Sequence, residues 1–250
     1  MLITLIKKSS VLKLKLKSLI GYTTIVFAII KFKKAVSKCK TLKEFIYLTY
    51  NFQFSIYSKK FFRFAVLPLQ VKGELDDFLK FILKTRPKII FECGTAHGGN
   101  LFLFSRLSTK DSLIISVDLP KGQFGGGYPS WKIPFYKSFA SYHQKIVLIR
   151  DDSHKILTHD RVEKALMNQK IDVAFIDGDH TYSGVKKDYD MYKKFVKPGG
   201  FMVFHDIVPH GNKRVGVPQF WKEIRQKYEY KEFVEDWNQK WGGIGLIFIK

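Results

Sequence analysis

Short apolar runs alternate with helical stretches along the chain from residue 75 onward. Apolar residues three and four positions apart predict a helix over Tyr182–Val196, which Lys197-Pro198-Gly199-Gly200 would end. The apolar runs themselves predict strands over Lys88–Glu92, Leu113–Asp118, Ile146–Arg150, Ile171–Asp177, Phe201–His205, Phe233–Asp236 and Gly245–Lys250. Strands that alternate with helices are typical of a doubly wound α/β fold, so we expect a Rossmann-like, mostly parallel sheet of about seven strands.

The first 50 residues are strongly basic. Eleven lysines face a single acid, Glu44, which gives this fifth of the chain +10 of the total formal charge of +21. Between Lys17 and Lys31 lie 13 uncharged residues. A spanning helix needs roughly 20 apolar residues, so this run is too short to cross a bilayer. It also lacks the small-residue cleavage site that follows a secretory signal.

This basic segment has an amphipathic pattern. On a helix, the apolar residues share one stripe and the lysines flank it; the residues are Leu12, Leu16, Leu19 and Ile20 with Lys13, Lys15 and Lys17. The pattern is typical of a helix that lies on an anionic membrane surface, and the alternative is a helical extension that packs on the main domain. We expect residues 1–45 to form this extension and residues 46–250 the main domain. We also expect residues 1–40 to attach to the inner face of the membrane.

The composition narrows the class of protein. With 46% apolar residues, the chain can bury a core, which excludes disorder and collagen-like repeats. Its two cysteines, Cys39 and Cys93, make neither a disulfide framework nor a zinc site, so a reducing, cytoplasmic location is expected. The remaining lysines are scattered and accompany no RNA-binding or helix-turn-helix motif, which disfavours a nucleic-acid partner.

Acidic residues close successive predicted strands. They are Glu92, Asp118, Asp152, Asp177 and Asp206. In open α/β sheets, ligands bind in the crevice outside the carboxyl ends of the strands, so these acids indicate a binding site. A single acid at such a position is more often a helix cap or a turn residue, which is the alternative for each of them.

A glycine-containing loop, residues 93–100, follows the first of these strands. Its glycines allow the backbone to approach a ligand closely. The spacing, Gly94-x-x-x-Gly98-Gly99, matches neither the dinucleotide-binding fingerprint nor a phosphate-binding P-loop. Asp118, at the end of the next strand, is well placed to accept hydrogen bonds from ribose hydroxyls. Together the loop and the acid favour a nucleoside-containing cofactor.

Five motifs then occur in a fixed order: E-C-G-T-A-H-G-G from residue 92, S-V-D from 116, D-D-S-H from 151, F-I-D-G-D-H-T-Y from 175 and K-P-G-G from 197. In this order they resemble the motifs of class I S-adenosylmethionine-dependent methyltransferases, in particular the cephalosporin-hydroxylase-like group with its small-molecule and sugar O-methyltransferases. The similarity extends from about residue 70 to residue 250, and it includes G-G-G-Y at residues 125–128 and V-G-V-P at residues 215–218.

The resemblance implies S-adenosylmethionine as cofactor and assigns residues to it. The implied contacts fall on Glu92, Gly94, Thr95, Gly98, Asp118, Asp152, Ser153 and Asp177. Of these, Asp118 would bind the ribose hydroxyls, and Asp152 with Ser153 would border the adenine. The two glycines and Thr95 would lie against the methionine part and the ribose. Glu92 would hold the turn or contact the amino-acid end.

Methyl transfer to a hydroxyl requires removal of its proton. Asp177, Asp179 and His180 offer two carboxylates and an imidazole within four residues, and we expect all three in the catalytic centre. His180 is the predicted general base, because the unperturbed imidazole pKa lies near neutrality. The alternative is that His180 caps the following helix or bonds a neighbouring carboxylate.

Asp177 and Asp206 end adjacent predicted strands and could jointly hold Mg²⁺, which prefers oxygen ligands. Catechol-type relatives use such a pair, but they have Asn after the second Asp, where this chain has Ile207. His205 or water would then complete the ligand set. His210, in the same loop, is expected to be exposed to solvent.

Two further segments are expected to enclose the acceptor. The glycine-rich stretch Pro120–Pro134 suits a lid over the cofactor and acceptor, or a plain surface loop. Trp237 and Trp241 would form a wall of the acceptor pocket or belong to the core. The sequence therefore predicts O-methylation of a sugar, glycan or natural-product hydroxyl. The alternatives are a non-catalytic, membrane-associated binding module on the same fold and a nucleic-acid-directed methyltransferase.

Overall fold

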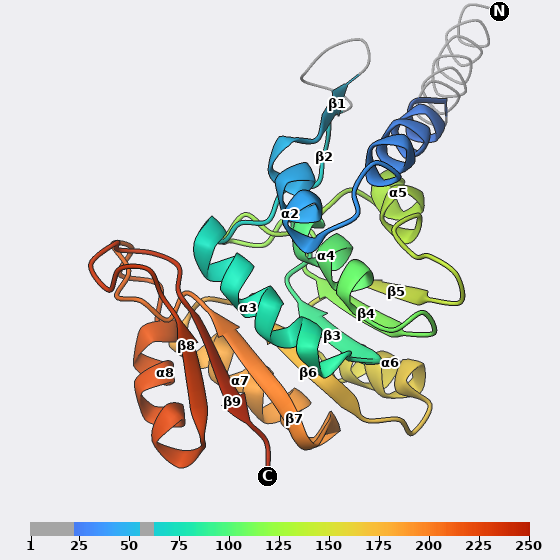
Figure 1. Cartoon of the computed structure of the whole chain (residues 1–250). Coiled ribbons are helices and arrows are strands. Elements are labelled where there is room, and N and C mark those ends of the chain that lie inside the picture. Colours follow the sequence, from blue (N-terminus) through green and yellow to red (C-terminus); the bar gives the residue numbers. More distant parts are fainter. Residues whose placement is uncertain (1–22, 56–62) are drawn as a thin grey trace, which may run out of the picture.

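The computed structural model describes residues 23–55 and 63–250, and its core is one seven-stranded sheet (Figure 1). The strands are β3 (Ile89–Cys93), β4 (Leu113–Asp118), β5 (Lys145–Arg150), β6 (Ile171–Ile176), β7 (Val196–His205), β8 (Tyr230–Phe233) and β9 (Ile244–Phe248). Their order is β5-β4-β3-β6-β7-β9-β8. β9 runs antiparallel to β7 and β8, and the other neighbouring strands are parallel. The predicted doubly wound, mostly parallel sheet is confirmed.

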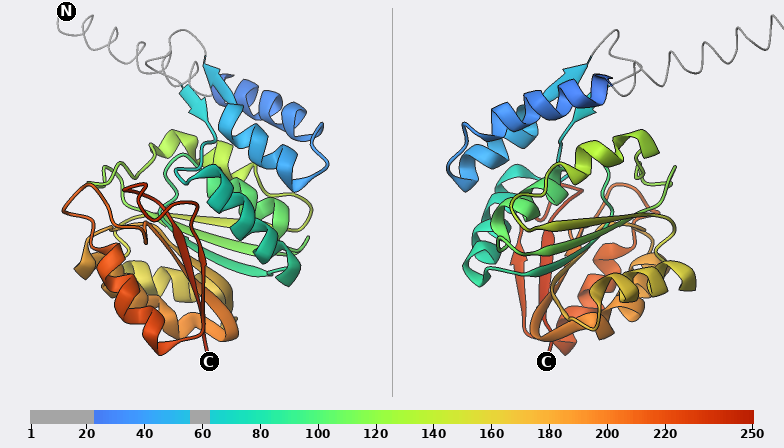
Figure 2. Two further views of the ribbon diagram at one scale, coloured as in Figure 1. Left: turned by 60° about the vertical axis from the view of Figure 1, so that its left-hand side comes forward. Right: turned by 90° about the vertical axis from the view of Figure 1, so that its right-hand side faces the viewer.

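Helices cover both faces of this sheet (Figure 2). One face carries α3 (Lys72–Thr85), α4 (Gly99–Leu107) and α5 (Ile133–Lys137), and the other carries α6 (Ile156–Leu166), α7 (Tyr182–Tyr192) and α8 (Val217–Ile224). A single 3₁₀ turn precedes α5 at Ser130–Lys132, and others follow α7 at Lys193–Phe195 and α8 at Arg225–Lys227. Successive strand residues point to opposite faces, so Ile90 packs under α3 and α4 while Phe91 stacks on Tyr192 of α7.

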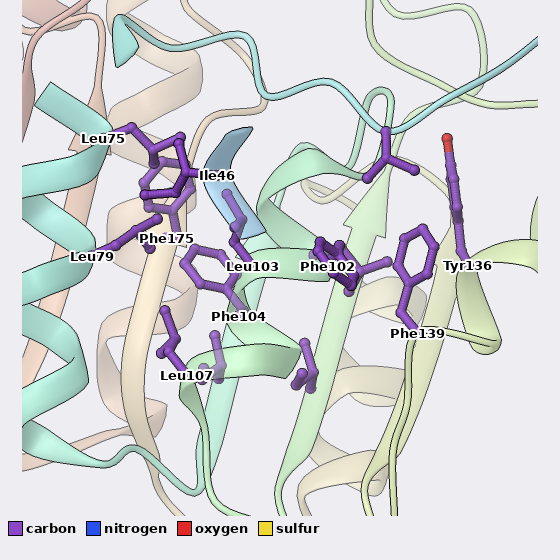
Figure 3. Close-up of a cluster of buried hydrophobic side chains, with 14 of the residues drawn as sticks. Ile46, Leu75, Leu79, Phe102, Leu103, Phe104, Leu107, Tyr136, Phe139 and Phe175 are labelled. Atoms are coloured by element: carbon purple, nitrogen blue, oxygen red, sulfur yellow. The ribbon is translucent and has the colours of Figure 1, made fainter. Parts of the chain in front are cut away.

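The apolar side chains of α3 recur at helical spacing and fix how this helix lies on the sheet. Leu75, Phe78, Leu79 and Ile82 are fully buried, and Phe78 meets Phe175 of β6 with ring centroids 5.8 Å apart. Figure 3 shows Leu75 and Leu79 facing the side chains that α4 contributes to the same core. This packing brings the N-terminal end of α3 to the edge where the parallel strands end.

Two predicted boundaries were wrong. The helix expected to reach Val196 ends at Tyr192, and β7 already begins at Val196 because the segment that includes Lys197 and Gly200 continues as strand. The strand predicted over Phe233–Asp236 ends at Phe233. Its expected continuation bends into a loop, because the Glu235 N–H donates to the Glu74 carboxylate rather than to a strand.

The described N-terminal residues form a cap over α4 and α5. The cap comprises the helical residues 23–36, α2 (Leu42–Asn51) and the hairpin of β1 (Gln53–Ser55) with β2 (Arg63–Ala65). Thr41 and Glu44 form a capping box at the start of α2. Phe32 is buried, and its ring lies 4.9 Å from that of Phe102 and 5.1 Å from that of Phe139. Residues 23–36 thus pack on the main domain.

The structure describes only part of the N-terminal segment. Residues 1–22, which hold the first amphipathic stripe, lie outside the described residues, and the division at residue 45 stays a prediction. The buried residues of helix 23–36 share one apolar cluster with α3 and α4. Among the described helices, none combines the length and the apolar character that crossing a bilayer requires.

Candidate active site

A cavity of about 610 Å³ opens at the carboxyl ends of the parallel strands. The predicted site residues that line it are Gly94, Asp118, Asp152, Ser153, Asp177, Asp179, His180 and Asp206. Glu92, Thr95 and Gly98 do not line it and lie beneath the glycine loop or at the start of α4. Trp241 lines the cavity, whereas Trp237 does not. Four of the five strand-end acids therefore meet at this cavity, and Glu92 lies beneath the glycine loop.

The glycine loop passes close to the strand that carries Asp177. Gly94 has φ +100°, and a side chain there would collide with the Asp177 carbonyl oxygen. Gly98 has φ +74° at the N-cap of α4, where its N–H donates to the Thr95 carbonyl over 2.7 Å. Both conformations favour glycine, which explains the two glycines of the motif.

Glu92 lies under this loop as a fully buried acid. The Ser116 hydroxyl donates to Glu92 Oε2 over 2.5 Å, and Thr95 Oγ1 lies 2.5 Å from Ser116 Oγ. Burial raises the pKa of Glu92 to about 8, although the bond from Ser116 opposes the rise. Glu92 Oε1 has no hydrogen-bond partner among the described residues. The side chain thus holds the turn through Ser116 and Thr95, and it is mostly protonated at neutral pH.

Asp118 joins two loops at the next strand end. Its Oδ2 accepts from the Ala96 N–H and its Oδ1 from the Gly127 N–H, each over 2.8 Å. Burial raises the pKa of Asp118 to about 6, although these backbone bonds oppose the rise. The carboxylate lines the cavity between the glycine loop and the predicted lid, which is the position that a ribose-binding acid requires.

The segment after β5 is held by an acid that the sequence analysis missed. Asp188 of α7 is fully buried, and its Oδ1 lies 3.2 Å from His154 Nε2. This contact raises the pKa of His154 although burial opposes the rise, while the His154 N–H donates to Asp152 Oδ1 over 2.9 Å. The signal for Asp188 was an acid on the apolar stripe of its helix, between Val185 and Tyr192.

Asp177, His180 and Asp206 form a compact, partly buried cluster with His205. His180 Nε2 lies 3.3 Å from Asp177 Oδ1, and His180 Nδ1 lies 3.0 Å from Asp206 Oδ2. His205 Nδ1 lies 3.1 Å from Asp177 Oδ1 and 3.5 Å from Asp206 Oδ1. Two imidazoles therefore share two carboxylates within this part of the cavity.

This arrangement favours the charged form of every group in the cluster. Burial alone would lower the pKa of His180, but its bonds to Asp177 and Asp206 outweigh burial and raise it to about 10. The same two carboxylates raise the pKa of His205 to about 9 against the effect of burial. Burial also opposes ionisation of Asp177 and Asp206, yet the histidines lower the pKa of both. While both bonds persist, His180 is protonated and does not accept a proton.

Asp179 lies differently from its neighbours. Its Oδ1 accepts from the Thr181 N–H over 2.9 Å, and its carboxyl group packs against Gly184 in the first turn of α7. The carboxylate is thus directed to the start of the helix rather than to His180, as is typical of a turn acid. Asp179 borders the cavity without joining the cluster.

Gln70 contacts the cluster from the segment before α3, and no motif in the sequence points to it. Its Nε2 donates to Asp177 Oδ2 over 2.8 Å, and the Tyr50 hydroxyl of α2 donates to the Gln70 carbonyl over 2.9 Å. Glu74, one turn into α3, accepts from Gln239 Nε2 over 2.6 Å and from the Gly243 N–H over 2.8 Å. The cap and α3 therefore hold the cluster and the loop beside it.

The predicted lid reaches the cluster at one residue. Phe124 stacks on His180 with ring centroids 4.7 Å apart and an interplanar angle of 13°. Tyr128, later in the same stretch, is buried against Tyr136 with ring centroids 4.8 Å apart. Phe124 was not singled out in the sequence, because its place over the imidazole depends on how the loop folds back.

The cluster has the donor set of a divalent-cation site. Asp177, His180 and Asp206 each offer one ligand atom, and these atoms lie within 4.8 Å of one another. Two ionised carboxylates and an imidazole fit a divalent cation. The position of the catechol-type Asn holds Ile207, whose side chain is buried. The residues present therefore fit a cation with a ligand set that differs from the catechol type.

Comparisons with known proteins agree with this geometry. Residues 91–207 match a family model described as a methyltransferase domain. This match agrees with the resemblance to class I S-adenosylmethionine-dependent methyltransferases seen in the five motifs. The matched segment begins in β3 and ends just after Asp206, so it includes the glycine loop and the charged cluster.

Solved structures share the fold at low sequence identity. The O-methyltransferase of tomaymycin synthesis from Streptomyces achromogenes, in complex with S-adenosylmethionine, has a TM-score of 0.51 at 14% identity and is covered to 84%, with 74% of this chain. An O-methyltransferase from Bacillus cereus, in complex with S-adenosylhomocysteine, gives 0.51 at 14% identity and is also covered to 84%, with 72% of this chain. A TDP-rhamnose 3'-O-methyltransferase of calicheamicin biosynthesis gives 0.52 at 16% identity over 91% of its length and 81% of this chain.

Curated relatives match only in part. An uncharacterized protein of Sinorhizobium fredii is 28% identical over 146 residues, which is 56% of this chain and 15% of that protein. An uncharacterized protein of Acanthamoeba polyphaga mimivirus is 40% identical over 68 residues, which is 24% of this chain and 31% of that protein. The chain thus matches less than a third of the length of these relatives.

Proposed function

We propose that the protein is an S-adenosylmethionine-dependent O-methyltransferase for a hydroxyl of a sugar, glycan or natural product. One observation carries the proposal: a single cavity joins the glycine loop and Asp118 to the charged cluster around His180. A methyl donor and a proton acceptor thus have adjoining places. The structural neighbours that act on TDP-rhamnose and in tomaymycin synthesis support a small-molecule acceptor.

The cofactor lies along the glycine loop in this proposal. Gly94 leaves room for the methionine part, with Thr95 and Gly98 shaping the loop from below. Asp118 accepts from the ribose hydroxyls, and Asp152 with Ser153 borders the adenine. Glu92 faces the amino-acid end from beneath the loop. Support comes from the cavity lining, since Gly94, Asp118, Asp152 and Ser153 all contribute to it.

Methyl transfer itself is a displacement at carbon. The acceptor oxygen forms a bond to the methyl carbon, the carbon–sulfur bond breaks, and the hydroxyl proton leaves the acceptor. We assign that proton to His180. When the acceptor enters, one of the two carboxylate bonds of His180 opens and the imidazolium releases its own proton to solvent, so that the freed ring nitrogen can accept the hydroxyl proton. Asp177 and Asp206 keep the imidazole oriented, and Gln70 holds the other oxygen of Asp177. Alignment and proton removal are what this reaction needs from the protein.

Asp177 and Asp206 would also hold Mg²⁺ or a similar cation, with His180 as a third ligand in place of its role as the base. A bound divalent cation would polarise the acceptor hydroxyl and neutralise the two carboxylates. Two features support this cation site: the donor set, and the ligand atoms, which lie within 4.8 Å of one another. Removal of the cation with a chelator should lower turnover, and added Mg²⁺ or Mn²⁺ should restore it. If turnover does not change with chelator, the cation has no part in the reaction and the acid–base assignment stands.

The test is a methyl-transfer assay with the full chain. Labelled S-adenosylmethionine is incubated with nucleotide sugars, phenolic and alcoholic natural products, transfer RNA and DNA, and calorimetry measures cofactor binding separately. We expect cofactor binding and label transfer to a hydroxyl of a small molecule. Binding without transfer would favour the non-catalytic module, whereas label in nucleic acid would favour the nucleic-acid methyltransferase. No cofactor binding would refute the proposal.

The proposal also includes location. Residues 1–40 would attach the enzyme to an anionic membrane surface at its inner face, because most of the excess lysines of the N-terminal segment lie beside an apolar run. Flotation of the full chain with anionic vesicles should fall as the salt concentration rises. Equal flotation with neutral vesicles would refute the electrostatic part of this attachment.

A further inference from the structure

Helix 23–36 of the cap buries one face and exposes another. Ala28 and Phe32 face the core and are 0% and 1% exposed. Val26, Phe27 and Ile30 point away from the core and are 38%, 55% and 56% exposed. Positions 26, 27 and 30 fall on one stripe of a helix, so these side chains form a continuous apolar surface, which we call the outer face. The helix that packs on the domain therefore still presents an apolar side.

Lysines continue the outer face at its C-terminal end. Lys33 and Lys34 are exposed and lie one turn beyond Ile30. Across residues 23–51 the cap carries six lysines and only one acid, Glu44, whose carboxylate is engaged by the Lys40 and Thr41 N–H groups. The cap thus pairs an uncovered apolar stripe with a strong excess of positive charge.

This combination fits an anionic lipid surface. Apolar side chains of an interfacial helix enter the boundary between headgroups and acyl chains, while lysines stay at the depth of the phosphates. A nucleic acid would use the lysines but would leave Val26, Phe27 and Ile30 in water. Charge complementarity and apolar exposure together therefore favour lipid as the occupant of the outer face.

We infer that the outer face is the part of the cap that enters an anionic membrane, with Val26, Phe27 and Ile30 inserted and Lys33 and Lys34 at the lipid phosphates. The inference rests on the proposed membrane attachment and assigns it to a face of helix 23–36. Within helix 23–36, packing on the domain and membrane contact then fall on opposite sides.

The cap also connects this face to the cavity. Figure 1 shows helix 23–36 beside α2, and α2 carries Tyr50, whose hydroxyl donates to the Gln70 carbonyl. Gln70 in turn donates to Asp177 in the charged cluster. A cap seated on lipid would therefore be connected to the charged cluster through α2 and Gln70.

The experiment compares variants of the full chain in vesicle flotation. The substitutions F27S and I30S together remove the apolar contact, and K33E with K34E reverses the charge. Each pair should lower partition into vesicles that contain phosphatidylglycerol by about tenfold or more, while partition into phosphatidylcholine alone stays weak. Cofactor affinity and melting temperature are measured in parallel and should stay near the wild-type values, because these side chains are exposed.

Matched control pairs lie elsewhere on the surface. Ile156 and Leu157 of α6 are 70% and 72% exposed, so I156S with L157S removes a comparable apolar pair. Lys186 and Lys187 of α7 are adjacent and exposed, so K186E with K187E makes the same charge change. Both control pairs should float like the wild type. A control pair that lowers flotation as much as the test pairs would overturn the inference.

The remaining outcomes also decide the question. Wild-type protein that ignores anionic vesicles overturns both the attachment and this inference. Wild-type flotation that survives F27S with I30S leaves the attachment to other residues and overturns only the outer face. Concentration-dependent self-association without vesicle binding, abolished by the same pair, would assign the face to a second copy of the chain.

Discussion

At the end of the cavity that we assign to the cofactor, Glu92 and Asp118 are buried acids whose pKa values burial raises to about 8 and about 6. At the end that we assign to the chemistry, Asp177 and Asp206 are also buried acids, but their pKa values lie below the usual value. All four end or follow strands of one sheet. They differ in their partners, since hydroxyl and backbone N–H groups meet the first pair and imidazoles meet the second.

A strand-end acid therefore has no fixed electrostatic role. The carboxylates at the chemical end are ionised in the folded protein, because protonated histidines lie beside them. The acids at the cofactor end have hydroxyl and backbone N–H partners instead of histidines, so burial raises their pKa values. The two ends of the cavity therefore differ in charge because their acids differ in partners.

The largest expected effect is the loss of turnover when the chemical end of the cavity is changed. His180→Ala should lower kcat by about 10²–10⁴-fold, the usual range for loss of a general base, while cofactor affinity stays near normal. Steady-state kinetics and calorimetry measure the two quantities. The exposed His143 provides the control, since His143→Ala should leave kcat unchanged. Full turnover in the His180 variant would contradict the base assignment.

The next effect concerns stability at the cofactor end. Because the folded pKa of Glu92 lies above its unfolded value, the stability it contributes is present below about pH 4 and is lost as pH rises through about 8. Across that range, Glu92 should lower the free energy of unfolding by roughly 3–5 kcal/mol. Glu92→Gln should remove this slope in urea titrations and leave the smaller slope of Asp118 in the same direction. The exposed Glu163, changed to Gln, should keep the wild-type slope.

A smaller effect is expected for cofactor affinity. Asp118→Ala should weaken binding of S-adenosylmethionine by roughly a hundredfold, because charge-assisted hydrogen bonds to ribose hydroxyls contribute about 1.5–3 kcal/mol each and the carboxylate also serves two backbone N–H groups. Calorimetry measures the dissociation constant. Unchanged affinity in a folded variant would contradict the assignment of Asp118 to the cofactor.

The smallest effect tests whether the cap supports the chemical end. Gln70→Leu keeps the bulk of the side chain and removes the bond to Asp177, so kcat should fall by about tenfold, the equivalent of one hydrogen bond to a charged group. Cofactor affinity should not change. Gln169→Leu, at an exposed glutamine after α6, is the matched control. Equal loss in cofactor affinity would indicate a general distortion of the cavity instead.

The sheet and the edge that carries the site could be predicted from the sequence because both depend on local patterns. An apolar run that ends in an acid gives both a buried strand and the place where it ends, and Asp118, Asp177 and Asp206 follow from this rule. The glycine positions were equally local, since Gly94 and Gly98 need positive φ. Strand direction then brings these residues to one edge without further information.

The support of the site could not be predicted, because its partners are far apart in the chain. Gln70 and Asp177 are separated by 107 residues, and Glu74 and Gly243 by 169. Neither Gln70 nor Glu74 ends a strand or belongs to a motif. Asp188 differs in that its position on an apolar helix stripe was a local sign of burial with a partner. The direction of the pKa shift of each acid could not be predicted either, because it depends on which side chain packs against that acid.

The insertion of β9 between β7 and β8 also has a consequence for the order of synthesis. The Gly242 N–H, just before β9, donates to Asp206 Oδ1 over 2.9 Å, and the next N–H, from Gly243, donates to Glu74 over 2.8 Å. The ribosome makes residues 242–248 after all the other strands of the sheet. In the folded sheet these residues lie between β7 and β8, which are made earlier. A nascent chain that already has its glycine loop and its strand-end acids therefore still lacks β9 and the bond from Gly242 to Asp206.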